Sequence, residues 1–104
     1  MIALHAELRV SPPHLTSVLA TLRALLALAA TEPGNLLYAV HRCDLETLVL
    51  YELYRDRTAC DTHLASPAVV AALASFAEVL REPPRIRFAE LLAAGGPLAS
   101  GIQP

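Results

Sequence analysis

Hydrophobic positions follow two different periods along the chain, and the change of period separates a strand from a helix. From Ile2 to Val10 every second position is apolar, and the polar residues His5, Glu7 and Arg9 lie between them, which predicts a strand with one buried face. Ser11-Pro12-Pro13 ends this strand, because proline cannot donate to a sheet ladder. Over residues 15–29 apolar residues recur at i, i+3, i+4 and i+7, which predicts an amphipathic helix. Thr31-Glu32-Pro33-Gly34 ends that helix.

The middle of the chain predicts a hairpin followed by a short helix. Residues 36–42 and 48–55 are rich in apolar and β-branched or aromatic residues, and the short link at 43–47 suits two antiparallel strands. Thr58-Ala59-Cys60-Asp61 resembles a capping box with aspartate in place of glutamate, so we expect a short helix to begin there.

The last third predicts a longer helix and a final strand. Ser66 and Pro67 suit the N-cap and first position of a helix. Pro83-Pro84 ends the helix, and residues 86–90 alternate again as a strand. The apolar stripe expected to face the core of this helix consists of Val69, Leu73, Phe76 and Leu80.

The order strand, helix, strand, strand, helix, strand is that of the split βαβ, ferredoxin-like fold. This fold is α+β, with four antiparallel strands and helices on one face of the sheet. We expect one domain over residues 1–92 and an irregular tail over 93–104, which carries three glycines and two prolines.

The strand at 48–54 is apolar on both of its faces, so it is expected to be covered on both sides. Helices on one face of the sheet leave the other face with an apolar patch larger than monomers usually expose. A second copy packed sheet to sheet about a two-fold axis is the simplest cover. The sequence therefore predicts a homodimer.

Composition narrows the class of protein. The chain has 104 residues, of which 55% are hydrophobic and 17% charged, and its net charge is −2, which excludes a disordered chain. All eight basic residues are arginine and they form no block, so nucleic-acid binding is not expected. The longest apolar runs, such as residues 24–30, are much shorter than the roughly 20 residues of a membrane helix. No signal peptide is visible, and we expect a cytoplasmic protein.

Three motifs resemble those of the antibiotic biosynthesis monooxygenase (ABM) family. Glu32-Pro33-Gly34-Asn35-Leu36-Leu37-Tyr38 is similar to the family's EPGxxxY segment, and Leu50-Tyr51-Glu52-Leu53-Tyr54-Arg55-Asp56 is similar to its lyExWxd strand. Asp61-Thr62-His63-Leu64-Ala65-Ser66-Pro67 resembles its xxHLxSPH helix. The resemblance extends in order from about residue 6 to residue 92.

The resemblance implies a dimeric α/β barrel built from ferredoxin-like halves, and an activity that uses no cofactor. Characterised members include monooxygenases that oxidise quinols, anthrones and related phenols with molecular oxygen, and others degrade haem. Two departures bear on activity: Tyr54 stands at the usual tryptophan, and Ala68 replaces the second histidine of the third motif. Haem-degrading relatives place asparagine, tryptophan and the iron-ligating histidine where this chain has Leu8, His63 and Leu73, so haem degradation is not expected.

His63 is the leading candidate for catalysis. The resemblance places it at the end of a short helix, facing a cavity between helices and sheet. An imidazole titrates near pH ~6.5 and can take a proton from a phenol, and a phenolate gives an electron to oxygen far more readily than the phenol. The alternative is a structural histidine that is hydrogen-bonded to the backbone.

Glu52 and the tyrosines are further candidates. Glu52 lies on the face of its strand that also carries Tyr54, so it needs a partner if buried, either Arg42 or an arginine of a second subunit. We expect a structural ion pair, with a second catalytic proton acceptor as the alternative. Tyr38, Tyr51 and Tyr54 are candidates for binding a substrate oxygen, but Tyr51 and Tyr54 point to opposite faces.

A zinc site is the competing reading of the histidines and cysteines. His41 and Cys43 share a strand face, and Cys60 and His63 share a helix face, so together they could form a Cys₂His₂ site. The spacing is not that of a zinc knuckle, and we expect no metal and two reduced thiols.

The resemblance thus implies a cofactor-independent monooxygenase that acts on a quinol-like or polycyclic phenol. His63 would be the proton acceptor. A non-catalytic dimeric barrel that binds a small aromatic ligand, and an isomerase on the same fold, are the two alternatives.

Overall fold

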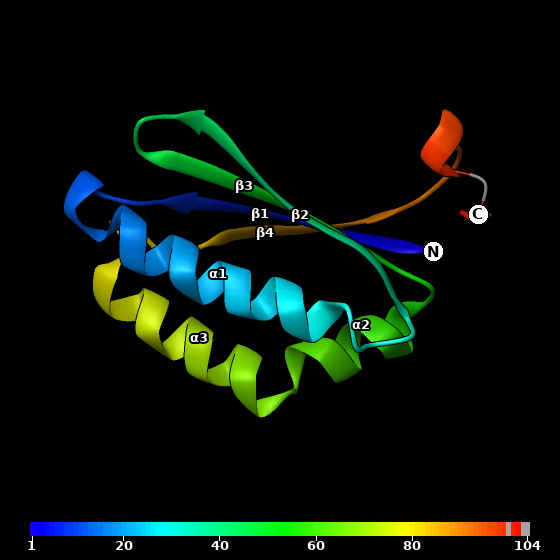
Figure 1. Cartoon of the computed structure of the whole chain (residues 1–104), viewed down its shortest axis with the longest axis horizontal. Coiled ribbons are helices and arrows are strands. Elements are labelled where there is room, and N and C mark those ends of the chain that lie inside the picture. Colours follow the sequence, from blue (N-terminus) through cyan, green and yellow to red (C-terminus); the bar gives the residue numbers. More distant parts are fainter. Residues whose placement is uncertain (100, 103–104) are drawn as a thin grey trace.

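A single four-stranded antiparallel sheet carries three α-helices on one of its faces (Figure 1). The computed structural model describes residues 1–99 and 101–102. The sheet order is β2-β3-β1-β4, which confirms the ferredoxin-like α+β fold. The strands are β1 (Ile2–Arg9), β2 (Asn35–Asp44), β3 (Thr47–Tyr54) and β4 (Arg85–Glu90).

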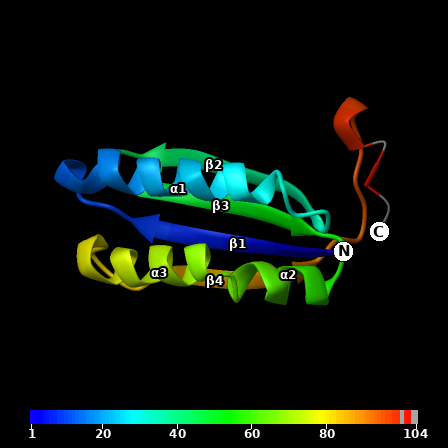
Figure 2. The ribbon, with the colours of Figure 1, turned by 60° about the horizontal axis from the view of Figure 1, so that its bottom comes forward.

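The helices divide the covered face of the sheet between them. They are α1 (Leu15–Ala29), α2 (Arg57–Leu64) and α3 (Pro67–Val79), with short 3₁₀ turns at η1 (Pro12–His14) and η2 (Pro97–Ala99). In Figure 2, α1 lies over the β2–β3 half of the sheet and α3 runs along the β4 edge. The site described below lies in the layer between these helices and the sheet.

Every second side chain of the strands points toward the helices, and these side chains form the core. β1 and β3 pair with Leu4 opposite Glu52 and Leu8 opposite Leu48, so the apolar set predicted for the first strand faces the helices. The helix α1 buries the stripe that the 3.6-residue period predicts, and α3 buries a neighbouring line of residues. The core members from α1 and α3 are Val18, Leu22, Leu25, Val69, Ala72 and Phe76.

The helix α2 begins earlier than predicted. Its N-cap is Asp56, whose carboxylate accepts a hydrogen bond from the backbone N–H of Ala59 (2.8 Å). The capping box expected at residues 58–61 is therefore wrong. Asp56 has the extended backbone that a cap requires directly after β3, whereas Asp61 pairs with Arg57 one turn away (3.0 Å).

Two other boundaries differ from the prediction. β2 and β3 extend toward each other until Leu45 and Glu46 alone form the turn, and the Asp44 carboxylate accepts from the Glu46 N–H (2.9 Å). On α3, Ser66 is the N-cap as predicted, but Leu73 is 40% exposed. The buried line of α3 passes through Val69, Ala72 and Phe76 instead, which turns Leu73 toward the edge strand β4.

Within residues 1–99 and 101–102, no single helix is long and apolar enough to cross a membrane. The helices α2 and α3 together satisfy the length and composition of a span, but they meet at an angle of 63°.

Candidate functional site

His63 is the centre of a buried cluster of polar side chains. It lies in the last turn of α2 and is 2% exposed. The helix ends directly after it, because Ser66 and Pro67 begin α3 on a new axis. The imidazole therefore projects from the end of α2 into the layer between helices and sheet.

Glu32 holds one nitrogen of this imidazole. Its Oε1 lies 2.6 Å from His63 Nδ1, and the Glu32 side chain is 21% exposed. Asn35 also donates to the same oxygen through Nδ2 (3.3 Å). An ionised carboxylate only accepts hydrogen bonds, so Nδ1 is the donor in this contact and Nε2 is the nitrogen left to exchange a proton with a substrate.

Gly34 allows the Glu32 loop to approach α2 closely. A Cβ at Gly34 would lie 2.4 Å from the Cβ of Ala59, which is closer than two carbons can pack. Arg55 fixes the loop from β3, since its backbone N–H donates to Gly34 O (2.8 Å) and its Nη2 donates to Pro33 O (2.9 Å). The glycine is thus the residue that lets a loop after α1 reach a histidine 31 positions later.

Glu52 lies beside the other nitrogen of the imidazole. Its Oε1 is 3.7 Å from His63 Nε2, which is too long for a hydrogen bond, and it accepts a short hydrogen bond from the hydroxyl of Tyr54. Burial raises the pKa of the Glu52 carboxyl above its ordinary value, while the Tyr54 hydroxyl and His63 act in the opposite direction. Burial and the neighbouring Glu52 likewise raise the pKa of Tyr54.

Tyr38 completes the wall around the imidazole. It pairs with Glu52 across β2 and β3, and its ring meets the His63 ring edge-on with centroids 5.8 Å apart. Burial, with the nearby Glu52 and Glu32 carboxyls, raises the pKa of the Tyr38 hydroxyl. The phenol is therefore neutral and can donate a hydrogen bond.

A small cavity adjoins His63, Glu52 and Tyr38. Its volume is about 50 Å³, and the other walls are almost entirely apolar. These walls come from all three helices, from β1, β3 and β4, and from the segment before β4. They are formed by Leu4, Ala6, Leu8, Leu25, Leu50, Leu64, Val69, Leu73, Phe76, Pro84 and Ile86.

The structure does not bring all the predicted site residues to this cavity. Tyr51 lies on the opposite face of the sheet, where its ring contacts His5 (centroids 5.0 Å apart). Arg42 is exposed and donates to the carbonyl of Asp44 (3.3 Å), so the expected Arg42–Glu52 ion pair is wrong. Tyr54 is fully buried and does not line the cavity; its hydroxyl holds Glu52.

Glu32 is the member of the cluster that sequence reasoning missed. In the sequence, Glu32 served only as part of the segment that ends the first helix and of the EPG motif. Because it lies in a loop, the hydrophobic periodicity did not predict where its side chain points. The only sequence feature that could have indicated Glu32 is the position of this acid directly before Pro33-Gly34.

The four candidate zinc ligands, His41, Cys43, Cys60 and His63, do not come together to form a metal site. Cys43 is exposed and Cys60 is buried, and burial raises the pKa of the Cys60 thiol. Among the residues that the structure describes, no group of three or more histidine, cysteine, aspartate or glutamate side chains is placed to hold a metal ion.

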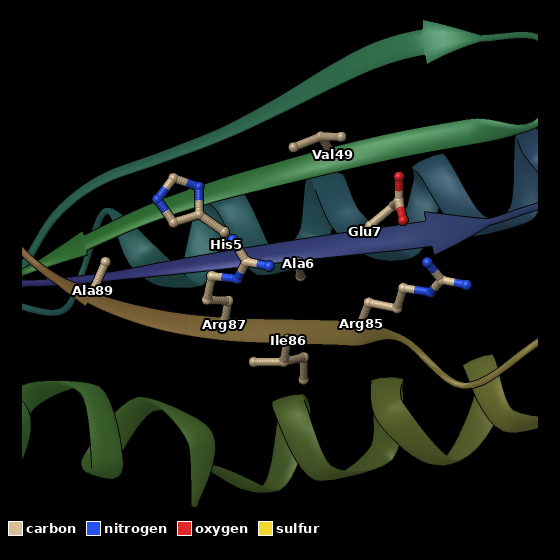
Figure 3. Close-up of a pocket in the computed structure, with 8 residues that line it drawn as sticks. All are labelled: His5, Ala6, Glu7, Val49, Arg85, Ile86, Arg87 and Ala89. Carbon is tan, nitrogen blue, oxygen red and sulfur yellow. The ribbon is translucent and has the colours of Figure 1, made fainter.

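The uncovered face of the sheet has a wider hollow that lacks this chemistry. It has a volume of about 530 Å³ and is open to solvent. Figure 3 shows His5, Glu7, Arg85 and Arg87 standing on this outer face, with Ile86 directed to the helix side. His63, Glu32 and Glu52 do not line it, so the candidate site is the smaller cavity.

The family profile of antibiotic biosynthesis monooxygenases matches residues 1–75. This chain belongs to the antibiotic biosynthesis monooxygenase family. The match includes the loop with Glu32, the two strands with Tyr38 and Glu52, and the helix with His63, so the whole cluster falls inside it. A comparison with curated proteins gave no match.

Solved structures share the complete fold. Rv0793 from Mycobacterium tuberculosis superimposes with a TM-score of 0.84 at 28% identity, covering 91% of this chain and 98% of that one. NE2512 from Nitrosomonas europaea, a protein of unknown function, gives 0.81 at 28% identity and covers 92% and 93%. A structure named antibiotic biosynthesis monooxygenase gives 0.81 at 22% identity, covering 89% and 100%, and shows the fold alone.

Proposed function

We propose that this ABM-family protein is a cofactor-independent monooxygenase that oxidises a quinol-like or polycyclic phenolic substrate with molecular oxygen. The observation that carries the proposal is the state of His63. It is buried, its Nδ1 is held by Glu32 at 2.6 Å, and its Nε2 is beside Glu52 at the wall of an apolar cavity. An imidazole whose Nδ1 is held by a carboxylate can take up a proton from a phenol at Nε2.

The first step is proton transfer from the substrate hydroxyl to His63 Nε2. Glu32 stabilises the imidazolium that forms, because its carboxylate faces the Nδ1–H. Tyr38 donates a hydrogen bond to the substrate oxygen from the cavity wall. Glu52 adds a second carboxyl beside Nε2, held in place by Tyr54.

The second step is transfer of an electron from the phenolate to oxygen, followed by bond formation between the two radicals. When the oxidised carbon is a CH₂ group, one oxygen atom remains as C=O and the other leaves with the two hydrogens as water. The substrate supplies all four electrons that reduce O₂. The reaction therefore balances without an external reductant.

Oxygen uptake by metal-stripped protein, measured with naphthohydroquinones and anthrones, tests this proposal. We expect turnover above autoxidation that a chelator does not change. His63→Gln should lose about two orders of magnitude in kcat, since a general base contributes roughly 10²–10⁴-fold. His14→Gln is the matched control, because His14 is exposed at the start of α1 and its side chain makes no cap hydrogen bond. Full turnover by His63→Gln would remove the base assignment.

The same assay on Glu32→Gln tests how His63 is held. The glutamine amide can donate to Nδ1, which favours the tautomer with its proton on Nε2, and this blocks proton uptake there. We expect about a tenfold or larger loss in kcat, together with a change in the Nδ1 and Nε2 signals in ¹⁵N NMR. Unchanged NMR signals would show that Glu32 does not set the tautomer.

The same oxygen-uptake experiment distinguishes two alternative functions. An isomerase would use the same base and turn over without consuming oxygen. A binding barrel would retain ligands and show neither reaction.

We also propose that the protein is a homodimer joined through the outer face of the sheet. Val49 and Tyr51 of β3 remain partly exposed there, as does Leu37 of β2 at 45%. A second copy would cover these residues.

A further inference from the structure

An open groove lies next to the His63 cavity, between α3 and the start of β4. Its volume is about 410 Å³. The helix side is formed by Leu73, Ala77 and Leu80, and the opposite side by the Pro83-Pro84 segment and Ile86. These walls are apolar, and Leu73 and Ile86 are 40% and 47% exposed.

The groove adjoins the cavity. Leu73, Pro84 and Ile86 line both spaces, so these three side chains form the boundary between them. Figure 3 shows Ile86 pointing from β4 toward α3 rather than toward the outer face. One turn further along α3, Ala77 also lines the groove.

The size of the cavity makes the groove necessary for a substrate. Sites for small organic ligands usually have volumes of roughly 300–1,000 Å³, whereas the cavity beside His63 has about 50 Å³. It accommodates the hydroxyl-bearing edge of a ring and little more. The groove alone has a volume within the usual range, so the two spaces together suit an extended molecule.

The charges at the end of the groove are already compensated. Arg81 forms an ion pair with Glu46, and Glu82 lies 3.3 Å from Arg85. Neither pair leaves an uncompensated charge for a substrate group. The groove therefore favours an uncharged apolar extension over a carboxylate or phosphate.

We propose that the α3–β4 groove binds an apolar extension of the substrate, whose hydroxyl-bearing ring enters the cavity at His63. The inference rests on the proposed function for its choice of reacting end. It narrows the substrate class to a phenol or quinol that carries an uncharged hydrophobic chain. Leu73, Ala77 and Ile86 are then the residues that determine specificity.

Binding of two unreactive phenols under anaerobic conditions tests the groove separately from oxidation. 4-Methylphenol has only the ring, whereas 4-pentylphenol adds four methylene groups. Each buried methylene contributes about 0.8 kcal/mol, so even partial burial predicts at least about tenfold tighter binding of 4-pentylphenol by calorimetry. Amide signals of Leu73, Ala77 and Ile86 in NMR should shift with 4-pentylphenol and much less with 4-methylphenol.

Ala77→Trp fills the groove and should remove the tenfold advantage while leaving the affinity for 4-methylphenol unchanged. Val70→Trp is the matched control, since Val70 is 55% exposed on the same helix and lines neither space. Both sites are exposed, so circular dichroism should show folded variants. Equal affinity of the wild-type protein for the two phenols, or an advantage that survives Ala77→Trp, would overturn the inference.

The outcomes separate the two proposals. Extension-dependent binding without oxygen uptake would support the groove and reject the oxidation. Oxygen uptake without extension-dependent binding would support the oxidation and reject the groove.

Discussion

Glu52 occupies an unusual environment for a carboxyl group, because it is 4% exposed in the middle of an apolar strand. Its contacts are a tyrosine hydroxyl and an imidazole nitrogen at 3.7 Å, and neither is a permanent cation. Burial is consequently the main influence on its pKa, which is raised. A buried acid without an arginine partner destabilises the fold when it ionises, which is common at functional sites.

Glu52→Gln should increase stability at neutral pH. The raised pKa means that the folded state holds the Glu52 proton more tightly than the unfolded state, whose pKa is near the ordinary 4.5. Wild-type stability from this group is therefore fully present below that pH and is lost as pH rises through the folded pKa. Glutamine does not titrate, and its amide oxygen can still accept from Tyr54.

Urea unfolding of both proteins at pH 4.5 and pH 8 measures this effect. The difference in the free energy of unfolding, Glu52→Gln minus wild type, should be more positive at pH 8. A difference that is the same at both pH values would show that Glu52 does not carry the raised pKa.

At the level of elements, α2 has the largest influence on the site although it has only eight residues. Its first residue is set by Asp56 and its end by Ser66-Pro67, and these two limits decide where His63 projects. The loop before β2 reaches α2 only because Gly34 has no Cβ. A helix this short has little stability of its own, so its cap and its packing hold it.

Asp56→Ala should destabilise the protein by about 1 kcal/mol, the typical cost of removing an N-cap side chain. Thr58→Ala is the matched control, since Thr58 was predicted as the cap but Asp56 has that role. Thermal unfolding of both variants measures the difference. Equal losses would show that the cap does not depend on Asp56.

For the whole molecule, the two faces of the sheet differ in chemistry. The helix face contains the apolar core and the His63 cluster. The outer face carries partly exposed Val49 and Tyr51 among charged residues of β1 and β4 (Figure 3). This face is more polar than the apolar strand at 48–54 predicted, because its neighbours contribute His5, Glu7, Arg85 and Arg87.

The proposed homodimer predicts a solution mass of twice the 11.1 kDa of one chain. Leu37→Arg should weaken association by at least about tenfold, since its cross-strand neighbour is Leu53 and burying an unpaired charge in an interface costs several kcal/mol. Leu45→Arg is the control, because Leu45 is 72% exposed in the β2–β3 turn. Light scattering over a dilution series measures both. A wild-type mass of one chain at micromolar concentration would exclude the dimer.

The sequence by itself determined the order of the elements and the faces of the strands. The two-residue and 3.6-residue periods are local properties of the backbone, so they located β1, α1 and α3 and placed Glu52 and Tyr54 on the face opposite to Tyr51. The resemblance to the ABM motifs singled out His63, and it also supported the fold.

The tertiary structure decided which side chains meet. The contact between Glu32 and His63 joins a loop and a helix end 31 residues apart, and no local pattern encodes that distance. The exposure of Leu73 and the opening beside Ile86 depend on how closely α3 approaches β4, which is set by packing across the whole core. Periodicity fixes the direction of a side chain relative to its own element, and only packing between elements fixes its neighbours.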